Sequence, residues 1–176
     1  GSVKITKTTN TGQNLGGWKI GLYTDSACTN LISGSPFITG SDGTVTVSGL
    51  QPGTLYAKEL ASSDPYWVCD TSVKAVTVVA GQTASVSFTN TQYGALEIRK
   101  STNTGNHLDG WKFIVKKDGT EIPGSPFTTD ETGIIRISNL APGKYLVLES
   151  PTEDPYWSVE LGFHTVTVEY GKTAVD

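Results

Sequence analysis

The sequence predicts an all-β protein made of two tandem Ig-like β-sandwich domains, and three observations support this fold class. The 176 residues include 25 Thr and 16 Ser, and β-branched residues such as Thr favour strands over helices. Short alternating runs of apolar and polar residues are separated by turn residues, a pattern typical of a β-sandwich. The whole pattern also occurs twice along the chain, which indicates two copies of one structural unit.

The repeat is visible as matching segments at a nearly constant offset. The offset is 93 residues at the start of the copies and 90 residues further on, so the first copy carries three additional residues near Cys28. We place domain 1 at residues 1–93 and domain 2 at residues 94–176. The matching pairs are Lys7–Gly12 with Lys100–Gly105, Gly17–Lys19 with Gly110–Lys112, Gly34–Phe37 with Gly124–Phe127, and Asp64–Trp67 with Asp154–Trp157.

Each expected strand of domain 1 is an alternating segment that begins or ends at a turn residue. Glycine and Pro-Gly pairs supply the turns because glycine adopts positive φ without steric cost. No segment keeps a helical period over ten residues. In chain order the expected strands are Val3–Thr9, Trp18–Tyr23, Gly43–Ser48, Thr54–Leu60, Ser72–Val79 and Thr83–Asn90.

The charge balance excludes several classes of partner. With 13 basic and 17 acidic residues the net charge is -4, and no basic stripe is present, so neither nucleic acid nor an anionic membrane surface is an expected partner. No apolar run approaches 18 residues and no leader-like segment opens the chain, so we expect neither a transmembrane helix nor a signal peptide. His107 and His164 lack neighbouring ligands at metal-binding spacing, so we expect no metal and no cofactor.

Three polar residues fall on the apolar faces of predicted strands. Because side chains alternate between the two faces of a strand, Lys7 shares a face with Val3 and Ile5. Glu59 and Asn90 lie on apolar faces by the same rule, and domain 2 repeats the lysine and the acid as Lys100 and Glu149. These residues are either strand ends that meet water, or a buried salt bridge, or groups whose charge is removed by a chemical reaction, because an unpaired buried charge is costly.

These segments resemble the CnaB-like (SpaA-type, prealbumin-like) domains of Gram-positive surface adhesins and pilins. The resemblance covers both copies. It rests on Val3–Lys7 and Leu96–Lys100, on the Pro-Gly segments 52–59 and 142–149, and on Val86–Asn90. It implies a spontaneous intramolecular isopeptide bond between Lys7 and Asn90, assisted by Glu59, with Glu149 as the corresponding acid of domain 2. It also implies the CnaB-type, prealbumin-like form of the sandwich.

The chemistry that the resemblance implies suits these residue types. Burial lowers the pKa of a lysine and raises that of a carboxyl group, so both side chains can be neutral in a core. We expect neutral Glu59 to donate a hydrogen bond to the Asn90 carbonyl oxygen and to pass on the proton that releases ammonia. This is a single self-modification rather than enzymatic turnover of a substrate.

The function that the resemblance implies is a structural stalk segment of an adhesin or pilin on the outside of a Gram-positive cell wall. Its partners would be neighbouring domains of the same surface protein. The alternative is a ligand-binding adhesin module that recognises a host matrix protein or a glycan. Tyr66, Trp67, Tyr156 and Trp157 would form its binding platform, whereas the opposite interpretation packs these aromatic residues over the edge of the sandwich.

Domain 2 lacks one of the three residues. The offset places its asparagine four residues beyond Asp176, so Lys100 and Glu149 have no carboxamide partner within the sequence, and the last strand of domain 2 is incomplete. Either the last strand is cut by the boundary of the sequence, or the domain has an open edge that accepts a strand from another chain by β-strand addition.

The two cysteines both belong to domain 1. Cys28 lies in the three-residue enlargement, Cys69 corresponds to Val159, and domain 2 lacks both. This joint presence predicts a disulfide in an extracellular protein, with two separate buried thiols as the alternative.

Overall fold

The computed structural model describes residues 1–176 and contains strands, turns and loops without helices. The chain divides into two compact units, Gly1–Gln92 and Tyr93–Asp176, called domain 1 and domain 2 below. Nowhere does the chain form a helix with the length and apolar character that crossing a membrane requires. The two tandem all-β domains predicted from the repeat are confirmed.

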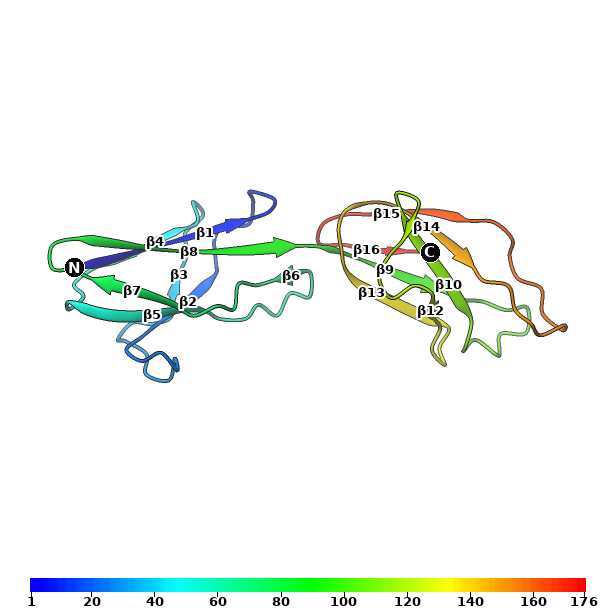
Figure 1. Ribbon diagram of the computed structural model, residues 1–176, viewed down its shortest axis with the longest axis horizontal. Helices are drawn as coiled ribbons and strands as arrows, with labels where there is room; N and C mark the ends of the chain where they lie inside the picture. The colour runs from blue at the N-terminus through cyan, green and yellow to red at the C-terminus, as the bar shows by residue number, and fades with distance from the viewer. The chain divides into compact units, whose positions relative to one another are not determined.

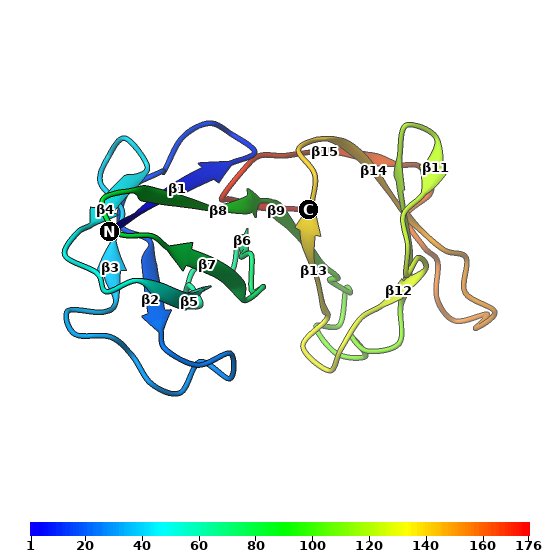
Figure 2. The same ribbon diagram turned by 60° about the vertical axis from the view of Figure 1, so that its left-hand side comes forward.

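Domain 1 is a sandwich of two four-stranded sheets (Figures 1 and 2). One sheet has the order β4-β1-β8-β6 and the other the order β3-β2-β5-β7. The strand bounds in chain order are β1 Ser2–Thr9, β2 Lys19–Tyr23, β3 Phe37–Ile38, β4 Thr44–Val47, β5 Gly53–Glu59, β6 Trp67–Val68, β7 Lys74–Val78 and β8 Thr83–Gln92.

All six predicted strands of domain 1 are present, with ends shifted by at most two residues. The two-residue strands β3 and β6 were not predicted, because a segment this short carries no alternation from which a strand could be recognised. The core lies between the two sheets. Its largest fully buried apolar side chains are Val3, Ile5, Ile20, Leu22 and Phe88.

The first and the last long strands of domain 1 are direct neighbours. β1 and β8 run parallel over eight residue pairs, from Ser2 opposite Thr83 to Thr9 opposite Asn90, and Figure 1 shows them side by side. Parallel neighbours need a long crossover connection, and here most of the domain supplies it. Residues that are far apart in sequence are therefore adjacent in one sheet.

Domain 2 repeats this arrangement with a shorter last strand. One sheet has the order β11-β10-β14-β15, with β12 paired to β10, and the other has the order β13-β9-β16. The bounds are β9 Gly94–Arg99, β10 Lys112–Lys117, β11 Thr120–Glu121, β12 Phe127–Thr128, β13 Ile134–Leu140, β14 Gly143–Glu149, β15 His164–Val168 and β16 Thr173–Val175. β16 runs parallel to β9 over only three residue pairs.

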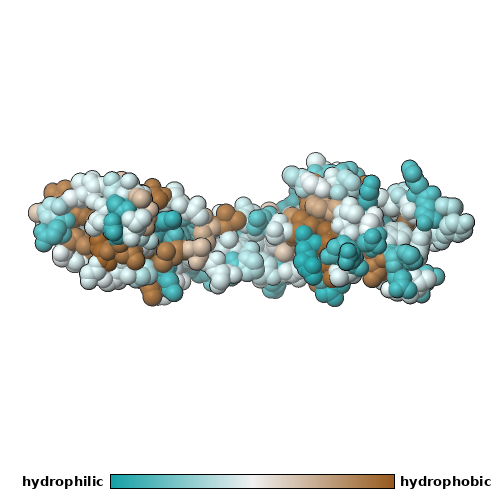
Figure 3. Space-filling view, turned by 90° about the horizontal axis from the view of Figure 1, so that it is seen from below, coloured by the Kyte–Doolittle hydropathy of each residue, from teal (hydrophilic) through white to brown (hydrophobic).

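The outer surface of both domains is mixed in character. In the view of Figure 3 hydrophilic and hydrophobic residues are interspersed on the surface of each domain. The apolar side chains that face inward form one separate core in each domain.

Candidate functional site

The centre of the candidate site is a buried lysine, acid and amide in domain 1, which we call the Lys7–Glu59–Asn90 cluster. Lys7 comes from β1, Glu59 from the end of β5 in the facing sheet, and Asn90 from β8. Their exposed fractions are 1%, 3% and 0%, so all three are withdrawn from solvent. The structure thus brings together the three residues that the sequence singled out.

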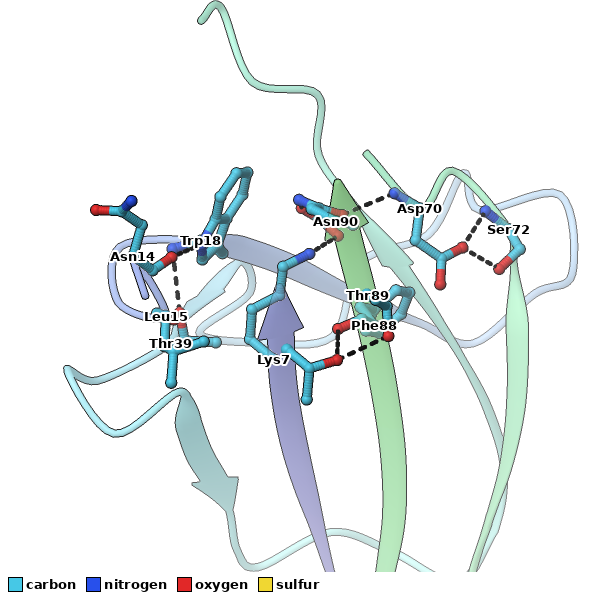
Figure 4. A network of polar contacts seen from close by, with 12 residues as sticks. Lys7, Asn14, Leu15, Trp18, Thr39, Asp70, Ser72, Phe88, Thr89 and Asn90 are labelled. Carbon is cyan, nitrogen blue, oxygen red and sulfur yellow. Dashed lines mark hydrogen bonds and ion pairs between the residues drawn. The ribbon is translucent and has the colours of Figure 1, made fainter. Parts of the chain in front are cut away.

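Glu59 bridges the other two side chains. The Lys7 amine donates a hydrogen bond to Glu59 Oε2 at 2.5 Å, and Asn90 Nδ2 donates one to Glu59 Oε1 at 2.6 Å. Each carboxylate oxygen therefore faces one nitrogen atom. Figure 4 shows Lys7 and Asn90 extending toward one another from the neighbouring strands β1 and β8.

The carboxamide of Asn90 is oriented differently from our expectation. Its Oδ1 accepts a hydrogen bond from the backbone N–H of Asp70 at 2.8 Å, and its Nδ2 faces Glu59. A backbone N–H can only donate, so the oxygen of the amide must point to Asp70. The prediction that Glu59 donates to the Asn90 carbonyl oxygen is wrong for this structure, because Glu59 faces the amide nitrogen and accepts a hydrogen bond from it.

Burial determines the electrostatics at the lysine. Desolvation lowers the pKa of Lys7 from its ordinary value, although the hydrogen bond and the charge of Glu59 oppose this effect. The amine lies 4.6 Å from the centre of the Trp18 ring, and Trp67 meets Trp18 edge-on at 5.1 Å. The two indoles thus screen the amine from water, a role that the sequence alone did not reveal.

A glycine holds the backbone of Lys7 close to the adjoining turn. Lys7 N–H donates to Gly43 O at 2.7 Å, and Gly43 has a φ of +79°. A Cβ atom at this position would lie 2.7 Å from Lys7 O, so only glycine fits without displacing the strand. Gly133 stands in the same relation to Lys100 in domain 2, with a Cβ distance of 2.9 Å.

Domain 2 retains the lysine and the acid without the amide. Lys100 donates to Glu149 Oε1 at 2.5 Å and lies 4.2 Å from the centre of the Trp111 ring. The side chains of Lys100 and Glu149 are 12% and 6% exposed, compared with 0% for the lysine and acid of domain 1. A small cavity of about 90 Å³ adjoins this pair, and Glu160, His164 and Asp176 also line it.

Cys28 and Cys69 are both free, so the predicted disulfide is wrong for this structure. Cys69 adjoins Asp70 beside the cluster, at the end of the domain where β2 begins opposite Glu59. Cys28 lies in the loop that follows the other end of β2. A strand of five residues is about 16 Å long, whereas a disulfide requires Cα atoms within about 7 Å.

The repeated aromatic residues pack mainly along the sandwich edge. Trp157 meets the buried Trp111 edge-on at 5.5 Å, as Trp67 meets Trp18 in domain 1. Tyr156 differs, because 92% of its surface is exposed. Trp111 and Trp157 also line a cavity of about 550 Å³, together with His107, Asp109, Lys112, Glu153 and Asp154.

Two facing β-sheets, with the first and the last strands parallel and adjacent, give each domain a prealbumin-like fold. The SpaA family, described as a prealbumin-like fold domain, matches residues 1–92 and 94–176. The chain belongs to this family. A comparison with curated protein sequences finds no match.

The comparison with solved structures finds matches of low sequence identity. The Bacillus anthracis TIE protein is 23% identical, with a TM-score of 0.50 over 100% of this chain and 33% of its own. A Streptococcal ancillary pilin is 18% identical, with a TM-score of 0.49 over 96% of this chain and 58% of its own. BcpA, the major pilin subunit of Bacillus cereus, is 11% identical, with a TM-score of 0.43 over 100% and 98%. The chain thus spans about a third of the first of these proteins and somewhat over half of the second.

Proposed function

We propose that domain 1 forms an isopeptide bond between Lys7 and Asn90, with Glu59 as the proton shuttle. The observation that carries this proposal is the complete burial of the three side chains with Glu59 hydrogen-bonded to both nitrogen atoms. Keeping Lys7 and Glu59 ionised in this buried position costs desolvation free energy, even though the two charges are paired. Transfer of one proton from the amine to the carboxylate leaves both neutral and the amine nucleophilic.

The proposed reaction uses the atoms that these hydrogen bonds bring together. Lys7 Nζ attacks Asn90 Cγ, the new bond forms between these atoms, and the carbonyl electrons move to Oδ1. The Glu59 carboxyl group, which holds the proton taken from the lysine ammonium, gives that proton to Nδ2 and takes another from Nζ, so it ends neutral as it began. The bond between Cγ and Nδ2 then breaks and ammonia leaves, with a mass loss of about 17 Da. Proximity within the folded domain provides much of the rate.

The cross-link suits a structural segment of a pilin or adhesin on the outside of a Gram-positive cell wall. The bond joins the adjacent, parallel strands β1 and β8 near their carboxyl ends, where Lys7 and Asn90 lie. Tension applied between the domain's ends would pass from β1 through the bond to β8, so residues 8–89 would carry no load. The partners in this role are neighbouring domains of the same surface protein.

Mass spectrometry of the intact chain tests this proposal directly. We expect the parent chain to weigh about 17 Da less than its sequence mass and the Glu59→Gln variant to have the full mass, because glutamine cannot shuttle a proton. Glu149→Gln in domain 2 is the matched control and should leave the mass loss unchanged. A parent chain of full mass would overturn the proposal.

We propose that the Lys100–Glu149 pair of domain 2 is prepared for the same reaction with a carboxamide from an additional strand segment next to β9. The small cavity beside the pair and the lower burial of both side chains support this assignment. The segment could come from another chain by β-strand addition.

The cavity at Trp111 and Trp157 supports a second candidate function, binding of a glycan. Its volume of about 550 Å³ lies in the range of ligand sites, about 300 to 1,000 Å³. The carboxylates of Asp109 and Glu153 line it without a hydrogen bond or ion pair in the structure, so they are available to accept hydrogen bonds from sugar hydroxyls. The half-buried Trp157 supplies an apolar surface for a sugar ring.

Titration with neutral oligosaccharides, monitored through the indole N–H resonances by NMR, tests this second function. Sugars that bind in the cavity should shift the resonances of Trp111 and Trp157 but not those of Trp18 and Trp67. The double variant Asp109→Asn, Glu153→Gln should weaken the response. Absence of any shift at millimolar sugar would refute glycan binding at this cavity.

A further inference from the structure

The Asn90 carbonyl oxygen has a donor that belongs to no side chain. The backbone N–H of Asp70 lies 2.8 Å from Asn90 Oδ1, and Figure 4 shows this contact. Asp70 belongs to the segment between β6 and β7, and its backbone contacts Asn90 near the end of β8. This N–H points at the atom on which negative charge develops when an amine attacks the carboxamide.

The side chain of Asp70 holds this segment in place. Asp70 Oδ1 accepts hydrogen bonds from Ser72 N–H at 3.1 Å and from Ser72 Oγ–H, and Oδ2 pairs with Lys74 Nζ at 2.9 Å. Partial burial raises the pKa of Asp70, but these contacts prevail and lower it to about 2. The carboxylate is therefore ionised at neutral pH, and the turn that directs the N–H remains tied to β7.

Domain 2 contains the same donor and directs it to a different acceptor. Glu160 occupies the position of Asp70 in the repeat, and its backbone N–H donates to Glu149 Oε2 at 3.2 Å. His164 pairs with the Glu160 carboxylate at 3.3 Å, as Lys74 pairs with Asp70 in domain 1. The fold thus presents this N–H in both domains, and where no carboxamide is present it binds the acid.

We propose that the backbone N–H of Asp70 is the oxyanion donor of the cross-linking reaction, and that the Asp70 side chain is a positioning group for it. The inference rests on the proposed isopeptide bond. Glu59 handles the protons at the two nitrogen atoms, and the N–H stabilises the negative Oδ1 of the tetrahedral intermediate until the bond to Nδ2 breaks. Removal of one such donor slows acyl transfer by about 10² to 10³-fold.

A single backbone substitution tests the donor. The full chain can be assembled from synthetic peptides by ligation at Cys28 and Cys69, with an ester in place of the peptide bond before Asp70, which replaces that N–H by an oxygen atom that cannot donate. The chain stays unfolded in denaturant and starts to react when it is diluted into folding buffer. The loss of about 17 Da is then followed by intact mass with time. A chain with the ester before Glu160 is the matched control.

We expect the all-peptide chain and the control to react at the same rate and the ester at Asp70 to react about 10² to 10³-fold more slowly. A folded ester chain that reacts within about twofold of the all-peptide rate would overturn the inference and leave the isopeptide proposal intact. An all-peptide chain that folds without losing mass would overturn the isopeptide proposal itself.

A second measurement decides the case in which the ester chain does not fold. In a Lys7→Met chain, which cannot cross-link, amide hydrogen exchange at Asp70 should be slow because Asn90 Oδ1 accepts its hydrogen bond. The further substitution Asn90→Ala should accelerate exchange at Asp70 by about tenfold or more, corresponding to loss of one hydrogen bond. Equal exchange in the two chains would refute the contact on which the inference depends.

Discussion

Replacement of the buried lysine by methionine should separate the effect of the cross-link from that of core packing. Lys7→Met keeps a linear side chain of similar volume on β1 and removes the nucleophile. A bond from residue 7 to residue 90 closes a loop of about 84 residues, and the chain-entropy relation for disulfides gives about 4 to 5 kcal/mol for a loop of this size. The variant also leaves Glu59 buried without its cation, and loss of one partner of a buried pair adds to the destabilisation unless the acid takes up a proton.

The expected change in melting temperature is large. In a domain of this size 1 kcal/mol shifts Tm by about 4–8 °C, so loss of the cross-link in Lys7→Met should lower the Tm of domain 1 by about 16 to 40 °C. Scanning calorimetry measures this shift, and intact mass shows in the same sample that the variant retains the ammonia. The transition of domain 2 serves as an internal reference.

Lys100→Met in domain 2 is the matched control, because it removes an equivalent lysine that has no amide partner within the sequence. It should leave both the mass loss and the Tm of domain 1 unchanged. Lys7→Met could melt within a few degrees of the parent chain although the parent has lost ammonia. This result would show that the cross-link restricts the entropy of the unfolded chain less than the loop length predicts, and it would refute the entropic reasoning.

Three further predictions address the rest of the molecule. Addition of the segment Ser87–Asn90 after Asp176 should give domain 2 its missing amide and double the mass loss to about 34 Da; an unchanged loss of about 17 Da would contradict the prepared state of its lysine and acid. The pKa of His164 is raised by its contacts with Glu160 and Asp176, so domain 2 should lose stability as the pH rises through the folded pKa above 6.5, as measured by urea unfolding at a series of pH values. The loss should stay below about 1 kcal/mol because solvent screens a half-exposed group, and a His164→Gln chain with the same pH dependence would contradict it. A thiol reagent should titrate two free cysteines in the native chain under oxidising conditions. A result of no free thiols would contradict this and support the disulfide.

Strand periodicity and the internal repeat are enough to predict the fold class, the two domains and the residues of the cluster. Alternation with period two placed Lys7, Glu59 and Asn90 on inward faces, because the pleat of a strand determines the face of every side chain once one residue is assigned. The second copy reinforced this result for the lysine and the acid. Short strands such as β3 and β6 remained invisible because two residues carry no period.

The tertiary structure decided which atoms meet. The orientation of the Asn90 carboxamide depends on the backbone N–H of Asp70, a group that every residue except proline carries and that no sequence pattern can mark. The separation of Cys28 from Cys69 likewise depends on the direction of β2 between them, not on their joint occurrence in one copy. The face on which each side chain lies follows from local periodicity. Contacts between distant segments follow only from the packing of the two sheets.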